Sequence, residues 1–361
     1  MRRMLKRVLP LVLVASSASA VTLVFAERQD GTDRQIAVVE RKAERRVDVS
    51  VGGKPFTSYI YPQSLEKPVL YPIRSAGGTL VTRGYPLEPR PGEAADHPHH
   101  VGHWFNYGDV NGFDFWGHSS ETPAANKPKM GVIVHKAILS AKGGADAGML
   151  MASADWNVPD GSTLMHEQVL FEFRAAAGMR SITRTTTWTA ADKPVTFNDT
   201  KEGAFGVRVA RELDHASNQP TRLVGSDAKP EAKPRVDNGK TTGQYLASDG
   251  TEGEAVWGSR GPWMALRGTV NGEPLTLVVL DHPSNHGYPT YWHARGYGLF
   301  AANPFGRQGY DPKQPPITFT LEPGATLIFR HRILVLNGHP GREELQKAFA
   351  EFAAEKGSPR L

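Results

Sequence analysis

Short runs that alternate apolar and polar residues recur along most of this chain, and they limit it to a fold built from β-strands. Residues 46–51 read RVDVSV and residues 181–189 read SITRTTTWT. A period of two is the pattern of a strand that buries one face. Thr79–Arg83 also has the composition of a strand, and Asn271–Gly272 marks a hairpin turn between two apolar runs.

Helical spacing of apolar residues occurs only near the C-terminus, in Arg342–Lys356. Leu345, Phe349 and Phe352 lie there at i, i+4 and i+7, which places them on one side of a helix. The sequence therefore predicts an all-β protein, a large antiparallel β-sandwich with one C-terminal helix. We expect a single sandwich domain over residues 27–340, followed by the helix and a tail over residues 341–361.

Residues 214–253 differ in composition from the rest of the chain. They are rich in Lys, Pro, Asp, Gly and Ser and poor in apolar residues. We expect a long surface loop here, and a loop of this length within a compact domain usually covers a site or is disordered.

The first 26 residues have the three parts of an export signal. Basic residues at positions 2–7 precede the apolar run Val8–Val14, and a run of small residues follows. We expect cleavage after Ala20 or Ala26, and a protein that is exported and either periplasmic or secreted. No later segment is long and apolar enough to cross a bilayer, so no membrane association is expected after cleavage.

The charge and the cysteine content exclude several classes of function. The formal charge of +5 includes four basic residues of the expected signal, and without them the chain carries +1. A nearly neutral chain without a basic run gives no electrostatic basis for binding nucleic acid. The chain has no cysteine, which excludes disulfides, thiolate metal sites and a cysteine nucleophile.

Polar and aromatic residues concentrate in Asp96–Trp116, which reads DHPHHVGHWFNYGDVNGFDFW. Imidazoles and carboxylates beside so many aromatic rings must be hydrogen-bonded or solvated, so we expect the wall of a pocket. A second such stretch covers Asp281–Gly309, and a third, shorter one covers Thr200–Gly203. We predict that the three stretches form one composite pocket.

The residue types in these stretches favour acid–base chemistry on a sugar. Aromatic rings stack on pyranose faces, whereas Asp, Asn, Arg and His hydrogen-bond to vicinal hydroxyls. Histidine moves protons near neutral pH because its ordinary pKa is about 6.5. As catalytic residues we predict His99, His100, His293, Glu202 and Asp109. As substrate-binding residues we predict Arg83, His97, His103, Trp104, Asn106, Asn111, Asp114, Lys201, His282, Tyr291, Trp292, Arg295 and Tyr297.

Two other interpretations of the histidines remain open. The protein is a metalloenzyme if His97, His99 and His100 ligate a divalent metal, although no cofactor is expected by default because the spacing matches no zinc signature. On a strand His97 and His99 would share one face and His100 would point the other way. The third interpretation is a carbohydrate-binding protein without catalytic activity. The isolated histidines are expected to be structural: His135, His166, His215, His331 and His339.

Five segments of this sequence resemble a bacterial family of unknown function labelled PmoA-like, or "methane oxygenase PmoA". They are RGYPLEPRPGE, DHPHHVGHWFNYGDVNGFDFW, NDTKEGAFGVRVA, WGSRGPWMALRG and YPTYWHARGYGLFAANPFG, and the resemblance runs from about Arg45 to Asn337. The antiparallel pattern and the terminal PGATLIFRHRILVLNG also resemble the supersandwich of galactose mutarotase-like proteins. That resemblance implies a small carbohydrate bound on a concave sheet, with His and carboxylate groups transferring protons in a lyase, hydrolase or epimerase reaction.

Overall fold

The computed structural model of the protein describes residues 34–355. The expected export signal, residues 1–26, lies outside the described residues, and so does the end of the predicted C-terminal tail, residues 356–361. Within the described part, no helix has both the length and the hydropathy needed to span a membrane.

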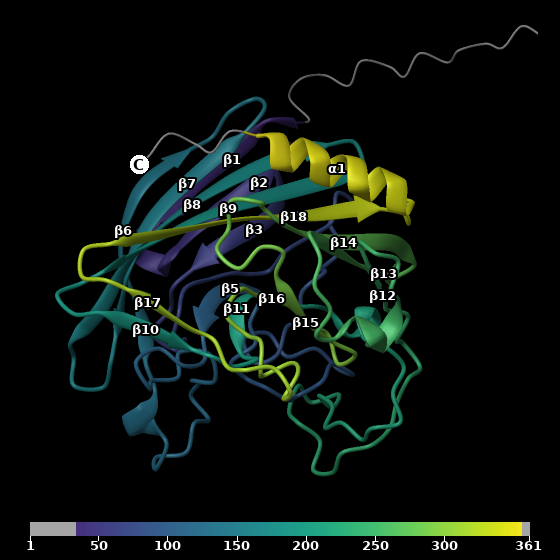
Figure 1. Ribbon diagram of the computed structural model, residues 1–361. Helices are drawn as coiled ribbons and strands as arrows, with labels where there is room; N and C mark the ends of the chain where they lie inside the picture. The colour runs from purple at the N-terminus through teal and green to yellow at the C-terminus, as the bar shows by residue number, and fades with distance from the viewer. Residues whose placement is uncertain (1–33, 356–361) are drawn as a thin grey trace, which may run out of the picture. The chain divides into compact units, whose positions relative to one another are not determined.

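Two eight-stranded antiparallel sheets form the described part of the chain (Figure 1). The first sheet has the strand order β1 (Ile36–Arg41), β2 (Arg46–Val51), β3 (Lys54–Ile60), β4 (Val69–Leu70), β5 (His103–Tyr107), β11 (Gly203–Arg208), β16 (Leu299–Asn303) and β15 (Tyr291–Arg295). The second has the order β12 (Gln244–Ala247), β13 (Trp263–Val270), β14 (Glu273–Asp281), β18 (Thr326–Asn337), β9 (Met179–Ala190), β8 (Thr163–Ala176), β7 (Gly148–Asn157) and β6 (Val132–Lys142).

The remaining regular elements are short. Strands β10 (Val195–Asn198) and β17 (Thr318–Leu321) pair with each other. The short 3₁₀ helices within residues 36–355 are η2 (Lys42–Glu44), η3 (Lys127–Lys129), η4 (Arg211–Leu213) and η5 (Gly253–Val256). Helix α1 (Arg342–Ala354) is the only α-helix in residues 34–355. The predicted all-β class, with large antiparallel sheets and one C-terminal helix, is confirmed.

Apolar side chains from both sheets meet in one core. The ring centroid of Phe105 in β5 lies 5.0 Å from that of Trp188 in β9 and 5.4 Å from that of Phe329 in β18. All three side chains are buried, and burying an apolar side chain such as Phe stabilises the fold by about 1.5–3 kcal/mol. Because side chains alternate along a strand, β5 turns Trp104 and Asn106 away from this core.

Helix α1 packs on the other face of the second sheet. Its buried residues Leu345, Phe349 and Phe352 contact a cluster that includes Val278 of β14 and Leu334 of β18. The helix begins after Gly341, whose N–H donates to the Glu344 carboxylate at 2.8 Å. The apolar spacing predicted from the sequence therefore corresponds to the buried side of α1.

Two local predictions have different outcomes. The predicted turn at Asn271–Gly272 joins β13 to β14, and both residues have positive φ, 50° and 80°, as two-residue hairpin turns require. The predicted strand Thr79–Arg83 is wrong. Only isolated bridges form there, from Leu80 to Arg74 and from Thr82 to Val209, because the chain is leaving the first sheet to enter the loops above it.

The long polar stretch 214–253 is not a loop throughout, since it ends in β12 and the start of η5. Its remaining part, residues 214–243, returns to its own starting point: Gly243 N–H donates to the Asp214 carbonyl at 2.9 Å. In the middle, the Arg222 carbonyl accepts a bond from Ala95 N–H and the Val224 carbonyl one from Gly92 N–H, both 2.8 Å. These bonds hold the loop against the segment that leads to Asp96.

Candidate functional site

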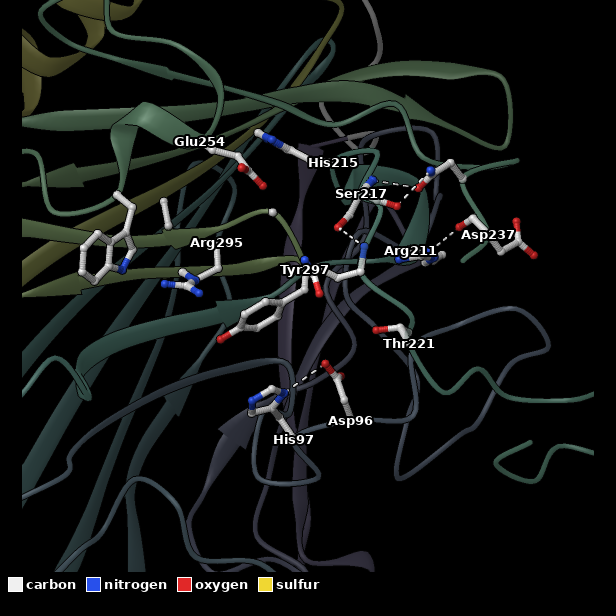
Figure 2. A pocket seen from close by; sticks show the side chains of 15 residues that line it. Asp96, His97, Arg211, His215, Ser217, Thr221, Asp237, Glu254, Arg295 and Tyr297 are labelled. Carbon is white, nitrogen blue, oxygen red and sulfur yellow. Dashed lines mark hydrogen bonds and ion pairs between the residues drawn. The ribbon is translucent and has the colours of Figure 1, made fainter. Parts of the chain in front are cut away.

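A cavity of about 490 Å³ lies between this loop and the first sheet (Figure 2). Strand β15 and the turn after it form one wall with Arg295 and Tyr297. The opposite wall comes from the loop, and Asp96 and His97 close a third side. Its other lining residues are Arg211, His215, Ser217, Gln219, Thr221, Asp237, Asn238, Glu254, Trp257, Ala294 and Gly296.

The first and second polar stretches meet at this cavity. The ring of His97 stacks on the ring of Tyr297, with centroids 5.0 Å apart and planes 2° apart. On its other side His97 stacks on His100 at 4.9 Å and 3°, and His100 stacks on Trp104 at 5.1 Å and 14°. Four rings thus form a column that runs from the cavity wall down to the outer face of β5.

The expected alternation of His97, His99 and His100 is wrong, because this segment is not a strand. His97 has φ 41°, in the left-handed region that few non-glycine residues adopt. His100 N–H donates to the His97 carbonyl at 2.9 Å, which closes a turn. The turn brings His97 and His100 onto the same side, so their rings stack.

Asp96 is held by two buried guanidinium groups. Its Oδ1 lies 2.5 Å from Arg83 Nη1 and 2.6 Å from Arg208 Nη2, and both arginines are 1% exposed or less. Burial alone would raise the pKa of the Asp96 carboxyl, but Arg208, His97 and Arg83 together hold that pKa well below its usual range. Asp96 is therefore ionised at neutral pH.

The second carboxylate oxygen of Asp96 orients His97. Its Oδ2 lies 3.0 Å from His97 Nδ1, and Figure 2 shows this contact at the edge of the cavity. A carboxylate beside Nδ1 favours the tautomer that carries the proton on that nitrogen and leaves the lone pair on Nε2. His97 is 41% exposed at its side chain, which leaves the ring accessible to a ligand.

A second group of titratable residues lies where His293 of β15 meets Lys201 and Glu202, which precede β11. His293 Nδ1 donates to the Lys201 carbonyl at 2.8 Å, and Glu202 Oε2 lies 3.9 Å from the same nitrogen. Burial lowers the pKa of His293 to about 4, and Glu202 offsets this only in part. His293 and Arg295 are two residues apart on one strand and so share its outer face.

Three predicted substrate-binding residues lie away from the cavity. His103 faces the core, where its Nδ1 bonds the Gly206 carbonyl at 2.9 Å. Trp292 is buried and its Nε1 donates to the Gly261 carbonyl at 3.1 Å. The ring of His282 packs against Phe352 of α1, 5.1 Å between centroids. Each sits on the core side of its strand or on the far sheet, and none of the three lines the cavity.

Four polar residues of the first stretch shape loops. Asn106 donates through Nδ2 to the Phe115 carbonyl. Asp109 Oδ1 accepts from Gly112 N–H at 3.0 Å, and Asp114 Oδ1 accepts from Trp116 N–H at 2.7 Å. Asn111 Oδ1 accepts from Thr196 N–H at 2.6 Å. Asp109, predicted as catalytic, thus has the geometry of a turn-forming residue, and it does not line the cavity.

Other predicted residues lie next to the Asp96–His97 pair or next to the His293–Glu202 pair. Lys201 forms an ion pair with Glu202, and Tyr291 stacks on Tyr310 at 5.2 Å. His99 lies edge-on to His100, with centroids 4.3 Å apart. Burial lowers the pKa of His99 to about 2, so this ring is neutral across the physiological range.

In residues 34–355 no group of three or more His, Cys, Asp or Glu side chains is arranged to hold a metal ion. The geometry of the predicted ligands explains this. The rings of His97 and His100 are parallel, so their lone pairs cannot point at one ion. In addition, His100 Nδ1 lies 3.3 Å from Arg208 Nη1. The positive guanidinium occupies that nitrogen and would repel a metal cation there.

Sequence reasoning missed several residues of the site. Asp96 had no predicted role, Arg208 and Trp257 were not singled out, and His215 was predicted to be structural. His215 does have a structural partner, because its Nε2 accepts from Tyr245 N–H at 3.2 Å, but its side chain also lines the cavity. The length and polarity of residues 214–253 were the signal that could have placed His215 near a site.

Solved structures align with this chain at low similarity. A GH36 α-galactosidase from Geobacillus stearothermophilus aligns over 84% of this chain and 41% of its own, at 13% identity and a TM-score of 0.39. Galactose 1-epimerase from Lactobacillus acidophilus aligns over 84% and 98%, at 10% identity and a TM-score of 0.37. A galactose mutarotase-like protein from Clostridium acetobutylicum aligns over 84% and 99%, at 11% identity and a TM-score of 0.40. Likeness at this level does not identify an activity.

Comparison of sequences identifies a family without an activity. No curated protein matches the chain, and the expected PmoA-like identity has no support in these comparisons. Residues 46–350 match the model described as "Family of unknown function (DUF6807)", and the chain belongs to that family.

Proposed function

We propose that this protein binds a small carbohydrate in the cavity and catalyses proton transfer on it, with His97 as the acid–base residue and Asp96 as its partner. The observation that supports this most directly is the Asp96–His97 pair in the cavity wall. A carboxylate that hydrogen-bonds Nδ1 fixes the tautomer of a histidine and stabilises the imidazolium that forms when Nε2 takes a proton. Arg83 and Arg208 keep Asp96 charged throughout.

The lining of the cavity suits a sugar. Its volume of about 490 Å³ falls in the range of about 300–1,000 Å³ for small-molecule pockets. The rings of Tyr297 and Trp257 add apolar surface to the lining, and the hydroxyls of Ser217 and Thr221 with the carboxylate of Glu254 offer hydrogen-bonding groups. Export, which we also propose from the pattern of residues 1–26, agrees with a carbohydrate substrate.

His293 and Glu202 supply a second proton-transfer pair in this proposal. His293 donates through Nδ1 to the Lys201 carbonyl, so its Nε2 is free to accept a proton. Two residues along β15 correspond to about 7 Å, so His293 lies near Arg295, which lines the cavity. With His97, this pair would serve a lyase, hydrolase or epimerase reaction, in which one group removes a proton while another donates one.

The test compares two His→Asn variants with a panel of neutral, oxidised and acidic sugars. His97→Asn removes the acid–base group, and Asn tolerates the positive φ of this position. His166→Asn is the matched control, because His166 also pairs with an aspartate, Asp155 at 2.7 Å, but on the second sheet. We expect turnover of at least one sugar, reduced about 10²- to 10⁴-fold in His97→Asn and unchanged in His166→Asn.

Two results would contradict the proposal. If no sugar of the panel binds, as measured by calorimetry or ligand-observed NMR, the cavity is not a carbohydrate site. If sugars bind but none is converted, or if both variants have the same activity, His97 is not an acid–base residue and the protein only binds its ligand.

A further inference from the structure

Of the arginine and lysine side chains that line the cavity, Arg295 is the one without a carboxylate within 4.0 Å among residues 34–355. Arg211 also lines the cavity, but its Nη1 lies 2.6 Å from Asp214 Oδ2. The Arg295 guanidinium forms no hydrogen bond with any described residue. An arginine left unpaired beside a cavity is a binding group for an anion.

Aromatic rings hold the Arg295 guanidinium in place. Its Cζ lies 5.5 Å from the ring centroid of Trp257 and 5.8 Å from that of Tyr297, within the range of cation–π attraction. A ring face offers no lone pair in the plane of a hydrogen bond, so these contacts leave the N–H groups of the guanidinium without carboxylate or carbonyl acceptors. Figure 2 shows Arg295 beside Tyr297 in the wall of the cavity.

The charges beneath the cavity also favour an anion. Arg83, Arg208 and Arg211 form one cluster with only two carboxylates, Asp96 and Asp214. Burial raises the pKa of Asp214 to about 6, despite the opposing effect of Arg208 and Arg211, so Asp214 is largely ionised at neutral pH. These five side chains then carry one surplus positive charge in a buried region, where the field is screened less than at a surface. Of the two other carboxylates in the lining, Asp237 forms an ion pair with Arg235.

We infer that the ligand of this cavity is an acidic sugar of the uronate class, and that Arg295 binds its carboxylate. This inference rests on the proposed function and narrows its substrate class. A planar carboxylate accepts two parallel N–H bonds from a guanidinium edge. Glu254, which lines the same cavity and has no partner among the described residues, accepts hydrogen bonds from the sugar hydroxyls.

The test measures binding of matched pairs of sugars by calorimetry: glucuronate with glucose, and galacturonate with galactose. We expect each uronate to bind about 10- to 100-fold more tightly than its neutral partner, the range for hydrogen bonds to a charged group. Arg295→Gln should remove this preference, so that each uronate binds no more tightly than its neutral partner. Arg295→Lys, which keeps the charge without the fork of N–H groups, should keep part of the preference.

Arg260→Gln is the matched control. Arg260 also lies over a tyrosine of β15, 4.9 Å from the centroid of Tyr291, and it is exposed and does not line the cavity. This variant should bind every sugar as the native protein does. Circular dichroism of each variant checks that a lost preference is not a lost fold.

The outcomes separate this inference from the proposed function. If neutral sugars bind as tightly as uronates, the uronate assignment fails although the carbohydrate site stands. If uronates are preferred and Arg295→Gln keeps the preference, the role of Arg295 fails. If neither kind of sugar binds, the proposed function fails together with this inference.

Discussion

The strongest quantitative prediction concerns Asp96→Asn. This change leaves the buried guanidiniums of Arg83 and Arg208 without a charged partner, at positions now 2.5 and 2.6 Å from the carboxylate. Removing one member of a buried ion pair costs about 3–5 kcal/mol. The Asp96 side chain is itself 24% exposed, and Asn keeps one carbonyl oxygen as a hydrogen-bond acceptor. We therefore expect the free energy of unfolding to fall by about 3 kcal/mol.

The assay is urea denaturation followed by tryptophan fluorescence, with Asp155→Asn as the control. Asp155 also pairs with two basic residues, Lys136 at 3.1 Å and His166 at 2.7 Å, but these are 55% and 57% exposed at their side chains. Exposed pairs of this kind are worth about 0–1 kcal/mol. If the two variants differ by less than about 1 kcal/mol, the buried network around Asp96 does not stabilise the fold as we argue.

The same prediction has a pH dependence with a definite sign. The pKa of the Asp96 carboxyl is held well below its usual range by Arg208, His97 and Arg83. A carboxyl with a depressed pKa stabilises the fold fully above its unfolded pKa, about 3.9, and this contribution is lost as the pH falls from there toward the folded pKa. The stability difference between the native protein and Asp96→Asn should therefore be constant from pH 7 to about pH 5 and shrink below about pH 4.

Three further predictions follow from burial and stacking. The His293 ring should titrate near pH 4 by NMR, because burial lowers its pKa to about 4, and a midpoint above pH 6 would refute this. The neutral ring favours the folded state fully above the unfolded pKa of about 6.5, and this contribution to stability is lost as the pH falls from 6.5 to about 4. Phe352→Ala should lower the free energy of unfolding, measured in urea, by about 3–5 kcal/mol, because the Phe352 side chain of α1 is fully buried. Leu139 is 47% exposed, and Leu139→Ala should change this free energy by less than about 1 kcal/mol. Tyr297→Ala should weaken sugar binding about tenfold or more by calorimetry and Tyr297→Phe much less, because Phe keeps the ring that stacks on His97; equal losses would show that the hydroxyl, not the ring, binds the sugar.

Strand positions were predictable because a strand leaves a local signature. The alternating run of residues 46–51 is β2 (Arg46–Val51), and the run of residues 181–189 lies within β9 (Met179–Ala190). Strand order has no such signature. Strand β5 pairs with β11, about a hundred residues later in the chain. This pairing depends on how the buried faces of all the strands pack together, which no short segment of sequence reveals.

The site was predictable in part. The first two polar stretches do meet, through His97 and Tyr297. They could be found from the sequence because a high density of polar and aromatic residues is visible in a short segment. The network around Asp96 was not predictable, since Arg208 lies 112 residues from it in sequence. His103 was a misreading of available information: in HWFNY it shares the period of Phe105 and Tyr107, which bury toward the core, so alternation assigned it to the core side.

The loop of residues 214–243 makes one side of the cavity separable from the rest of the protein. Its two ends lie together, joined by the hydrogen bond from Gly243 N–H to the Asp214 carbonyl. The residues between them therefore do not connect distant points of the sheets. A short turn could replace it with no change in strand register, as loop lengths vary on a fixed framework. Descendants of this fold could therefore acquire new ligands by exchanging this loop and the segment 92–95 that bonds it, while the two sheets stay as they are.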